Sequence, residues 1–261
     1  MTEILTEAQQ RVADRVLAEE GALRRHLVVS LTGAHAYGFP SPDSDLDLKA
    51  IHILPSARFF RLTGVELSSD RLETIDGVEV DYSSNELQQV LRGIVQGNGN
   101  FIERVLGALT LRSSPEHTEL IPLVRGSISK RIHRHYRGFA TGQFQEWENT
   151  QRASAKKLLY VLRTTLTGAH ALSTGEMVTD VTRLLEPYGF EAAQELVERK
   201  RQGERIALSA AMSERWRTDI IRAFSVLDQA LATSSLPEQP PNLAALEGWL
   251  LEVRRAHFDT S

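Results

Sequence analysis

The spacing of apolar side chains divides the chain into two regions. Over residues 4–25 the apolar positions recur every three or four residues, which predicts an amphipathic helix. Residues 26–31 form a short apolar run that predicts a strand, and the small residues at 32–38 predict a turn after it. Residues 45–54 open by alternating acidic and apolar side chains, which is the pattern of a strand with one buried face.

Helical periodicity replaces the strand pattern further along the chain. Strand candidates continue at 65–67, 71–75 and 78–82, and Asp76-Gly77 is typical of a hairpin turn. Helices are predicted from residue 84 onward and, later, over 98–106, 116–147, 150–172, 190–211, 213–233 and 242–257. We therefore expect an α+β fold, with a mixed sheet and flanking helices over residues 1–112 and an all-helical domain over residues 113–261.

Composition narrows the class of protein without naming a function. The 261 residues are 41% hydrophobic and 25% charged, as in ordinary globular proteins. The absence of cysteine excludes disulfides, thiol nucleophiles and cysteine-ligated metals. The acidic N-terminus is not a signal peptide, and no apolar stretch is long enough to span a membrane, so a cytoplasmic location is the default expectation.

Charge differs between the two regions. The net charge is -4, with -6 over residues 1–111 and +2 over the remainder. An acidic first region followed by a mildly basic second region agrees with two modules.

The pattern with the clearest chemical meaning is Asp45-Leu46-Asp47. Residues two apart on a strand share a face, so both carboxylates project together. Carboxylates this close repel each other unless a divalent cation lies between them. Glu79 and Asp81, on a later strand candidate, are both candidates for a third carboxylate. Such a set suits two Mg²⁺ ions in phosphoryl transfer, although an Asp-x-Asp pair by itself is usually a solvated strand face.

A glycine follows the first strand candidate. Gly33 would let a phosphate group approach the backbone closely, and the Thr32 hydroxyl lies beside it. Only a short spacer separates this turn from Asp45. The ordered combination of strand, glycine turn, Ser-Asp-x-Asp strand and acidic strand is more informative than any one of its parts.

These residues resemble those of a known superfamily. Gly33-Ala34-x-Ala36-Tyr37-Gly38 and Ser44-Asp45-Leu46-Asp47 are similar to the signature of DNA polymerase beta-type nucleotidyltransferases. Within that superfamily the chain most resembles the RNA-repair-associated, RlaP-like predicted nucleotidyltransferases. These also carry a segment that reads Gly97-Asn98-Gly99-Asn100-Phe101-Ile102-Glu103 here.

The resemblance implies a fold, an activity and a set of site residues. Asp45, Asp47 and Asp81 would hold two Mg²⁺ ions, with Mn²⁺ as an alternative, and Asp81 suits the third position better than Glu79. The triphosphate of an NTP, with ATP the expected one, would be seated at a group of residues: Thr32, Gly33, Ala34 and Ser44. The reaction would transfer a nucleoside monophosphate to a hydroxyl acceptor and release pyrophosphate.

Three positions depart from the usual pattern of the superfamily. Ala34 replaces a serine whose hydroxyl touches the phosphates, His35 replaces a frequent arginine, and Gly99 replaces a proline. Losing the hydroxyl removes about 1 kcal/mol of hydrogen bonding. A regulatory member that binds nucleotide or RNA without transfer is therefore the alternative prediction.

Basic residues of the second region offer further contacts. Lys156, Tyr160 and Arg163 share one helix face and suit a nucleotide, whereas an ordinary solvated face is the plainer interpretation. The basic run at 125–137 suits an RNA backbone, although such runs usually form a solvated surface. Arg163 and His170 have the spacing of HEPN ribonucleases, so a fused ribonuclease or toxin–antitoxin module is another alternative. The sequence does not indicate an oligomeric state.

Overall fold

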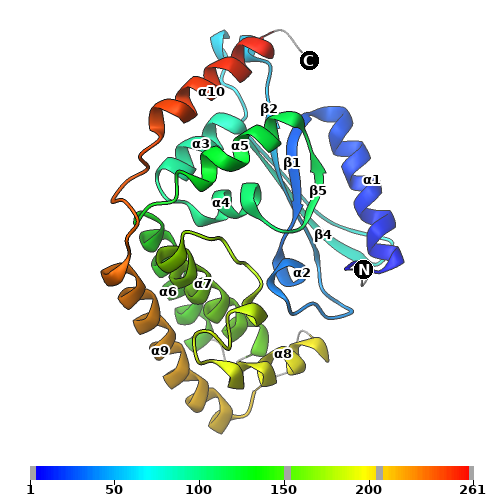
Figure 1. Cartoon of the computed structure of the whole chain (residues 1–261). Helices are drawn as coiled ribbons and strands as arrows, with labels where there is room; N and C mark the ends of the chain where they lie inside the picture. Colours follow the sequence, from blue (N-terminus) through cyan, green and yellow to red (C-terminus); the bar gives the residue numbers. More distant parts are fainter. Residues whose placement is uncertain (1–3, 150–153, 204–207, 259–261) are drawn as a thin grey trace.

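A computed structural model describes residues 4–149, 154–203 and 208–258 of the chain. A five-stranded sheet with the order β3-β4-β2-β1-β5 lies in its first half (Figure 1). The strands are β1 (Arg25–Leu31), β2 (Leu46–Ile53), β3 (Ser68–Ile75), β4 (Val78–Glu86) and β5 (Thr110–Ser113). Strands β2 and β4 are parallel and the other neighbours are antiparallel, which confirms the predicted mixed sheet.

Helices cover both faces of this sheet. On one face α1 (Glu7–Leu23) packs Val12 and Val16 against alternate strand residues, among them Leu48 and Val80. On the other face lie α3 (Leu87–Val95), α4 (Gly99–Leu106) and α5 (Pro115–Arg125) (Figure 1). The even-numbered positions of β2 face α1, and the odd-numbered positions face the other layer, because side chains alternate along a strand.

The second half is a helical layer built around one central helix. This helix, α7 (Ala155–Thr174), contacts α6 (Ile132–Glu148), α8 (Gln194–Arg201) and α9 (Ala210–Thr233). The short helix α2 (Gly33–Tyr37) belongs to the same core, because Ala34, Tyr37 and Phe39 pack among the residues of α7 and α8. The turn after β1 therefore joins the sheet to the helical layer. Single-turn helices η1 (Ser56–Phe60), η2 (Val181–Arg183) and η3 (Glu191–Ala193) lie in connections.

The last helix, α10 (Leu243–Ala256), returns to the first half of the chain. It packs on α3 and α5, as Figure 1 shows. Arg254 forms a 2.6 Å ion pair with the fully buried Glu86. The backbone carbonyl oxygen of Arg254 accepts a 2.8 Å hydrogen bond from Ser56 Oγ. One apolar cluster consequently contains Val28 of β1 and Trp249 of α10. The domain boundary at residue 112 stays a prediction.

Several predicted elements were wrong in extent. Residues 65–67 are irregular, and β3 begins only at Ser68, opposite Asn85 of β4. The helix expected over 116–147 is two helices, because Gly126 ends α5 and α6 begins at Ile132. Within its described residues, the helix expected over 190–211 is divided into η3, α8 and the start of α9 at Ala210. Residues 204–207 of this prediction and 150–153 of another predicted helix lie outside the described residues.

Strand β5 has no counterpart among the predicted elements. It has four residues, lies at the sheet edge and is mostly exposed, so it has little apolar pattern. Within the described residues no helix combines the length and the apolar composition needed to cross a bilayer.

Candidate active site

Three carboxylates lie together at one end of the parallel strand pair. Asp45 comes directly before β2, and Asp47 on β2 is the register partner of Asp81 on β4. Burial first, and then the nearby charges of Asp81 and Asp45, raise the pKa of Asp47 to about 6 against the opposing effect of Lys49. The spacing of the Asp-x-Asp motif and the parallel register thus create a cluster of repelling carboxylates.

The glycine turn lies directly against this cluster. Gly33 has a φ of +63°, and a Cβ built on it would be only 1.7 Å from Asp47 Oδ2. The Thr32 amide donates a 2.9 Å hydrogen bond to the Asp47 carbonyl oxygen, which holds the turn beside β2. Only glycine fits this backbone conformation and this contact together.

Two lysines balance part of the negative charge. Lys49 Nζ lies 2.7 Å from Asp81 Oδ1, and Lys156 Nζ on α7 lies 3.9 Å from Asp45 Oδ2. Among the residues that the structure describes, no three carboxylate or imidazole side chains converge as closely as a bound metal ion requires. The carboxylate oxygens of the cluster are the kind of ligand that Mg²⁺ prefers. In this structure the ammonium groups of Lys49 and Lys156 balance part of their charge.

The basic stripe of α7 packs on the glycine turn. Lys156 reaches Asp45, and the Tyr160 ring stands edge-on to Tyr37 with 5.7 Å between the ring centroids. Two turns along α7 from Lys156, the Arg163 guanidinium lies 3.7 Å from the centroid of the same Tyr37 ring. The three predicted nucleotide-binding residues of α7 therefore support the turn that carries Gly33.

Arg163 belongs to a buried polar network. Its Nη1 lies 2.7 Å from Glu103 Oε1, which also accepts a 2.8 Å hydrogen bond from the Tyr136 hydroxyl. Arg163 is 2% exposed and Glu103 is 5% exposed. Burial raises the pKa of Tyr37 to about 12, so this neighbour stays a neutral phenol. A buried, ion-paired guanidinium is not placed to meet a nucleotide, so the geometry does not favour that predicted role for Arg163.

Two other predicted phosphate contacts also lie inside the protein. Ala34 is 3% exposed and belongs to the apolar core of the helical layer. Ser44 Oγ accepts 2.9 Å hydrogen bonds from the Ser41 amide and from the ammonium group of the buried Lys200. Ala34 and Ser44 are therefore both buried in the protein next to the site. Thr32 and Gly33 remain beside the carboxylates, so the predicted phosphate seat is reduced to these two.

Sequence reasoning overlooked two basic residues near the carboxylates. Lys49 lies two residues after Asp47 on the same strand face, and this alternation could have revealed it. Arg104 donates to the Ala50 carbonyl oxygen at 3.2 Å. Burial lowers the pKa of Arg104 to about 10, and Asp70 and Asp81 oppose that effect. No sequence signal marked Arg104, because its place depends on how α4 packs on the sheet.

The remaining candidates separate from the site. Glu79 is exposed and lies just before the β2–β4 pairing, which begins at Leu46 and Val80, whereas Asp81 is the register partner of Asp47. His170 Nδ1 lies 3.3 Å from the Tyr188 hydroxyl, and Arg163 is buried against Glu103. The geometry therefore does not favour a ribonuclease site that would use Arg163 and His170.

The basic run borders a cavity of its own. Lys130, Arg131 and Arg134, near the start of α6, line a cavity of about 810 Å³ together with Gly97 and Asn98 of the α3–α4 turn. Part of the charge is balanced, since Lys130 pairs with Glu238. The cavity brings two sequence features together, the basic run and the Gly97–Glu103 segment.

Comparison with known proteins identifies the family. The sequence profile of the RNA repair pathway DNA polymerase beta family matches residues 6–252. The chain belongs to this family. It is 28% identical over 225 residues to an uncharacterized protein of Methanocaldococcus jannaschii, covering 85% of this chain and 90% of that one. It is 27% identical over 226 residues to the uncharacterized protein YcgL of Bacillus subtilis, covering 83% of each chain.

A solved structure is also similar to the chain. It is a nucleotidyltransferase-like protein from Exiguobacterium sibiricum, with a TM-score of 0.35, 14% sequence identity and coverage of 95% of this chain and 80% of that one. The family match confirms the resemblance predicted from the Gly33 turn and the Asp45-Leu46-Asp47 motif.

Proposed function

We propose that this protein is a metal-dependent nucleotidyltransferase. It would move a nucleoside monophosphate from an NTP, ATP being the expected one, to a hydroxyl acceptor and release pyrophosphate. The observation that carries the proposal is the cluster of Asp45, Asp47 and Asp81 with the bare backbone of Gly33 pressed against Asp47. The family and its polymerase beta description support the same reaction class.

The residues have separate roles in this proposal. Asp45, Asp47 and Asp81 would hold two Mg²⁺ ions, or Mn²⁺ as the alternative, which when bound would neutralise and polarise the phosphate oxygens. Thr32 and Gly33 would border the triphosphate, and the missing side chain of Gly33 leaves room for the Asp47 carboxylate beside it. Lys49 and Lys156 would have to give up their contacts with Asp81 and Asp45, and both would then be free to face phosphate oxygens.

An RNA end is the acceptor that we favour. The cavity beside Lys130, Arg131 and Arg134 is lined with more basic than acidic side chains and suits a phosphate backbone. The RNA repair description of the family points the same way. Replacing Arg131 and Arg134 with glutamine should weaken RNA binding and reduce its salt dependence, without changing the NTP affinity measured by calorimetry in the absence of RNA.

The decisive test is release of pyrophosphate from labelled NTPs in the presence of magnesium and a short RNA whose end supplies the acceptor hydroxyl. The wild-type protein should release it, and the Asp45→Asn/Asp47→Asn variant should lose at least a hundredfold in rate because both metal-holding charges are gone. The Asp14→Asn/Asp219→Asn variant removes the same charge from residues outside the site and should keep the activity. Equal release by the wild type and the site variant would refute the proposal.

A binding member without transfer activity is the second candidate. Ala34 and the two lysine contacts favour it, because they weaken the phosphate seat and compete for the carboxylates. Calorimetry would then detect NTP binding, whereas no pyrophosphate would appear with RNA ends or other hydroxyl acceptors.

A further inference from the structure

A second polar pocket lies on the other face of the sheet, away from the carboxylates. Asp47 and His52 are both on β2, and five residues of extended strand separate them by about 17 Å. Their positions differ by an odd number, so their side chains project from opposite faces. His52 faces the layer of α1 and borders this second pocket, which is therefore separate from the candidate active site.

The pocket is small and its lining is mainly basic and hydroxylic. Its volume is about 220 Å³, and Arg24, Arg58, Arg61, His52 and Ser68 are among the residues that line it. A water molecule takes up about 30 Å³ of liquid, so the space suits a phosphate-sized anion with a few waters. A whole nucleotide would need the larger volume that is typical of small-molecule sites, roughly 300 Å³ or more.

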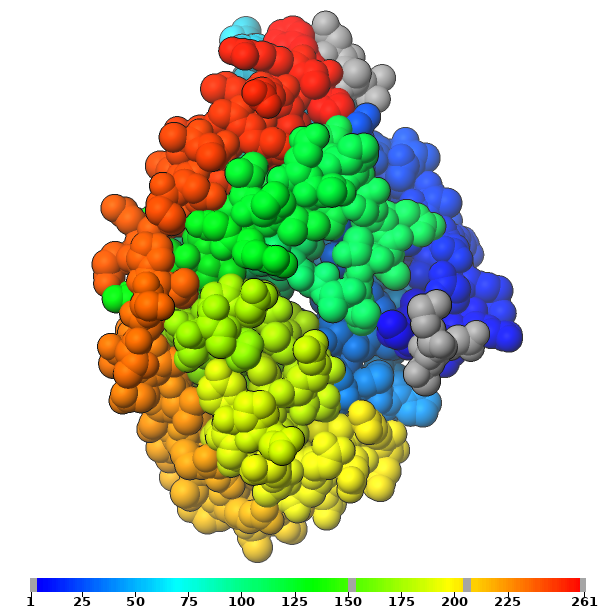
Figure 2. Space-filling view, in the orientation of Figure 1, coloured from blue at the N-terminus to red at the C-terminus, as the bar shows by residue number. Residues whose placement is uncertain are grey.

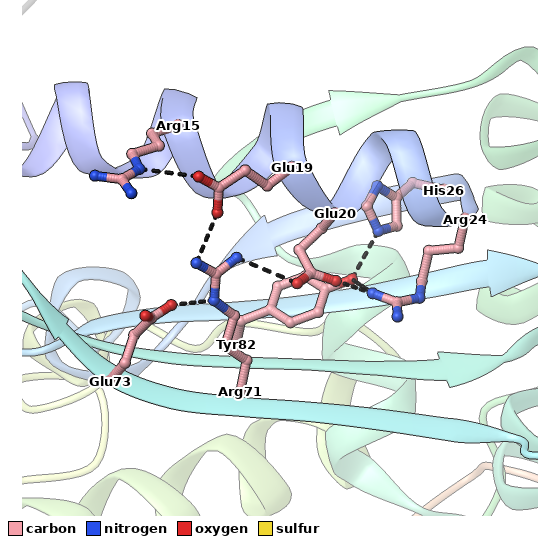
Figure 3. Close-up of polar contacts among 8 residues, drawn as sticks. All are labelled: Arg15, Glu19, Glu20, Arg24, His26, Arg71, Glu73 and Tyr82. Atoms are coloured by element: carbon pink, nitrogen blue, oxygen red, sulfur yellow. Dashed lines mark hydrogen bonds and ion pairs between the residues drawn. The ribbon is translucent and has the colours of Figure 1, made fainter.

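Arg24 is held rigidly at one side of the pocket. Figure 3 shows the network that fixes it, in which Glu20 contacts both Arg24 and Arg71. The Tyr82 hydroxyl accepts a 3.3 Å hydrogen bond from Arg24 and lies 2.7 Å from His26 Nε2. The charge of Arg24 is thus balanced by Glu20, and its guanidinium is preorganised beside the pocket.

Arg58 and Arg61 supply positive charge that is not balanced in this way. Both are exposed on the segment that follows β2, and neither forms an ion pair within the described part of the chain. Glu66 also borders the pocket, and it too forms no ion pair with a described residue. Two free guanidinium groups face a single carboxylate, so the pocket carries an excess of positive charge.

His52 adds a neutral donor at the floor of the pocket. It is 3% exposed, and its Nδ1 lies 2.7 Å from Ser84 Oγ, whereas Nε2 has no hydrogen-bond partner among the described residues. Burial first, and then the neighbouring Arg24, His26 and Arg254, together lower the pKa of His52 to about 4. The ring is therefore uncharged at neutral pH. When Ser84 donates to Nδ1, Nε2 carries the hydrogen and has a donor to offer a ligand.

We propose that this pocket binds a phosphate dianion. Arg58 and Arg61 would pair with its oxygens, and His52 Nε2 would donate a hydrogen bond from the floor. The same chemistry is offered by free phosphate and by the terminal phosphomonoester of an RNA or a nucleotide. The site is independent of the proposed transfer reaction, because none of its residues belongs to the carboxylate cluster.

Calorimetric titration with inorganic phosphate at constant ionic strength tests the proposal. The wild-type protein should bind phosphate saturably, and the Arg58→Gln/Arg61→Gln variant should bind at least tenfold more weakly. The Arg11→Gln/Arg217→Gln variant removes the same charge from other exposed positions and should bind like the wild type. In nitrogen-15 spectra, phosphate should shift the His52 ring resonances of the wild type and not those of the Arg58→Gln/Arg61→Gln variant.

The Asp45→Asn/Asp47→Asn variant separates this site from the proposed active site. It should lose pyrophosphate release and keep phosphate binding. Absence of saturable binding, equal binding by the Arg58→Gln/Arg61→Gln variant, or loss of binding in the Asp45→Asn/Asp47→Asn variant would each overturn the proposal.

Two short RNAs that differ only in their 5′ end identify the source of the phosphate. If the 5′-phosphorylated RNA binds more tightly than the 5′-hydroxyl RNA, and only when Arg58 and Arg61 are present, the ligand is a terminal phosphomonoester. If the two RNAs bind equally while inorganic phosphate still requires the two arginines, the ligand is free phosphate. Both results support the pocket.

Discussion

Single residues decide how closely the glycine turn approaches the carboxylates. Gly33 combines a left-handed backbone with a contact that leaves no room for a Cβ beside Asp47. Gly77, in the β3–β4 hairpin, has a similar positive φ of +81°, but open space surrounds the position of its absent Cβ. A substitution at Gly77 therefore tests the effect of left-handed backbone strain alone, whereas a substitution at Gly33 adds the steric contact with Asp47.

Replacing Gly33 with alanine should abolish pyrophosphate release, because the new methyl group displaces the Asp47 carboxylate. Gly77→Ala is the matched control and should cost about 1 kcal/mol of stability through left-handed strain alone, with activity retained. Urea unfolding and the pyrophosphate assay measure the two effects. Full activity of Gly33→Ala would show that the contact does not matter.

Protonation of His52 should make the protein sensitive to acid. Its pKa is lowered to about 4 in the folded state, so between pH 6.5 and 4 the unfolded chain takes up this proton first. The free energy of unfolding should fall by up to about 3 kcal/mol across that window, with no contribution above it. Urea unfolding at pH 8 and pH 4.5 should show a smaller fall for His52→Gln than for the wild type. An identical fall would contradict this.

Among the secondary-structure elements, α7 determines where the glycine turn lies. It contacts the turn through Lys156, Tyr160 and Arg163, and Arg163 is in turn held by Glu103 of α4. The Gly97–Glu103 segment thus acts on the site through α7, and not through direct contact with the three carboxylates. Figure 2 shows a small opening where green, yellow-green and blue surfaces meet.

The Glu103→Gln substitution should cost about 3–5 kcal/mol of stability, because it leaves the Arg163 charge buried without its carboxylate. The Glu103→Gln/Arg163→Met double variant should recover part of that loss. Glu146→Gln breaks the exposed pair with Lys157 and should cost less than about 1 kcal/mol. Urea unfolding of the four proteins checks the order, and equal losses for Glu103→Gln and Glu146→Gln would contradict it.

Over the whole molecule, the N-terminal and C-terminal halves share one core. The apolar cluster that contains Val28 and Leu91 also contains Leu172 of α7, Leu227 of α9 and Trp249 of α10. Unfolding of either half would expose the other half's part of this cluster. We therefore expect the halves to unfold together.

Tryptophan fluorescence can test this, because Trp147 and Trp216 lie in the helical core and Trp249 lies in the shared core. The Trp147→Phe/Trp216→Phe variant reports the shared core, and Trp249→Phe reports the helical core. Within each variant, the urea midpoint from fluorescence should equal that from far-ultraviolet circular dichroism. Two separate transitions would instead support independent domains with a boundary near residue 112.

Patterns that repeat over a few residues were predictable from the chain alone. Alternation located β2, and helical periodicity located α1, α7 and α9 to within a few residues. Strand β5 and the ends of the helix expected over 116–147 were not predictable, because edge pairing and a single helix-ending glycine leave little periodic signal. Lys49 was accessible from strand alternation, whereas Arg104 was not.

The sequence by itself determined the mixed α+β fold and the family, because these depend on local periodicity and motif spacing. Only the tertiary structure decided that Asp81 is the register partner of Asp47 and that Arg163 is buried against Glu103. It alone brought α10 back onto α3 and α5 and placed Arg24, Arg58 and His52 around one pocket. Such contacts join residues that are distant along the chain, and packing between elements decides them.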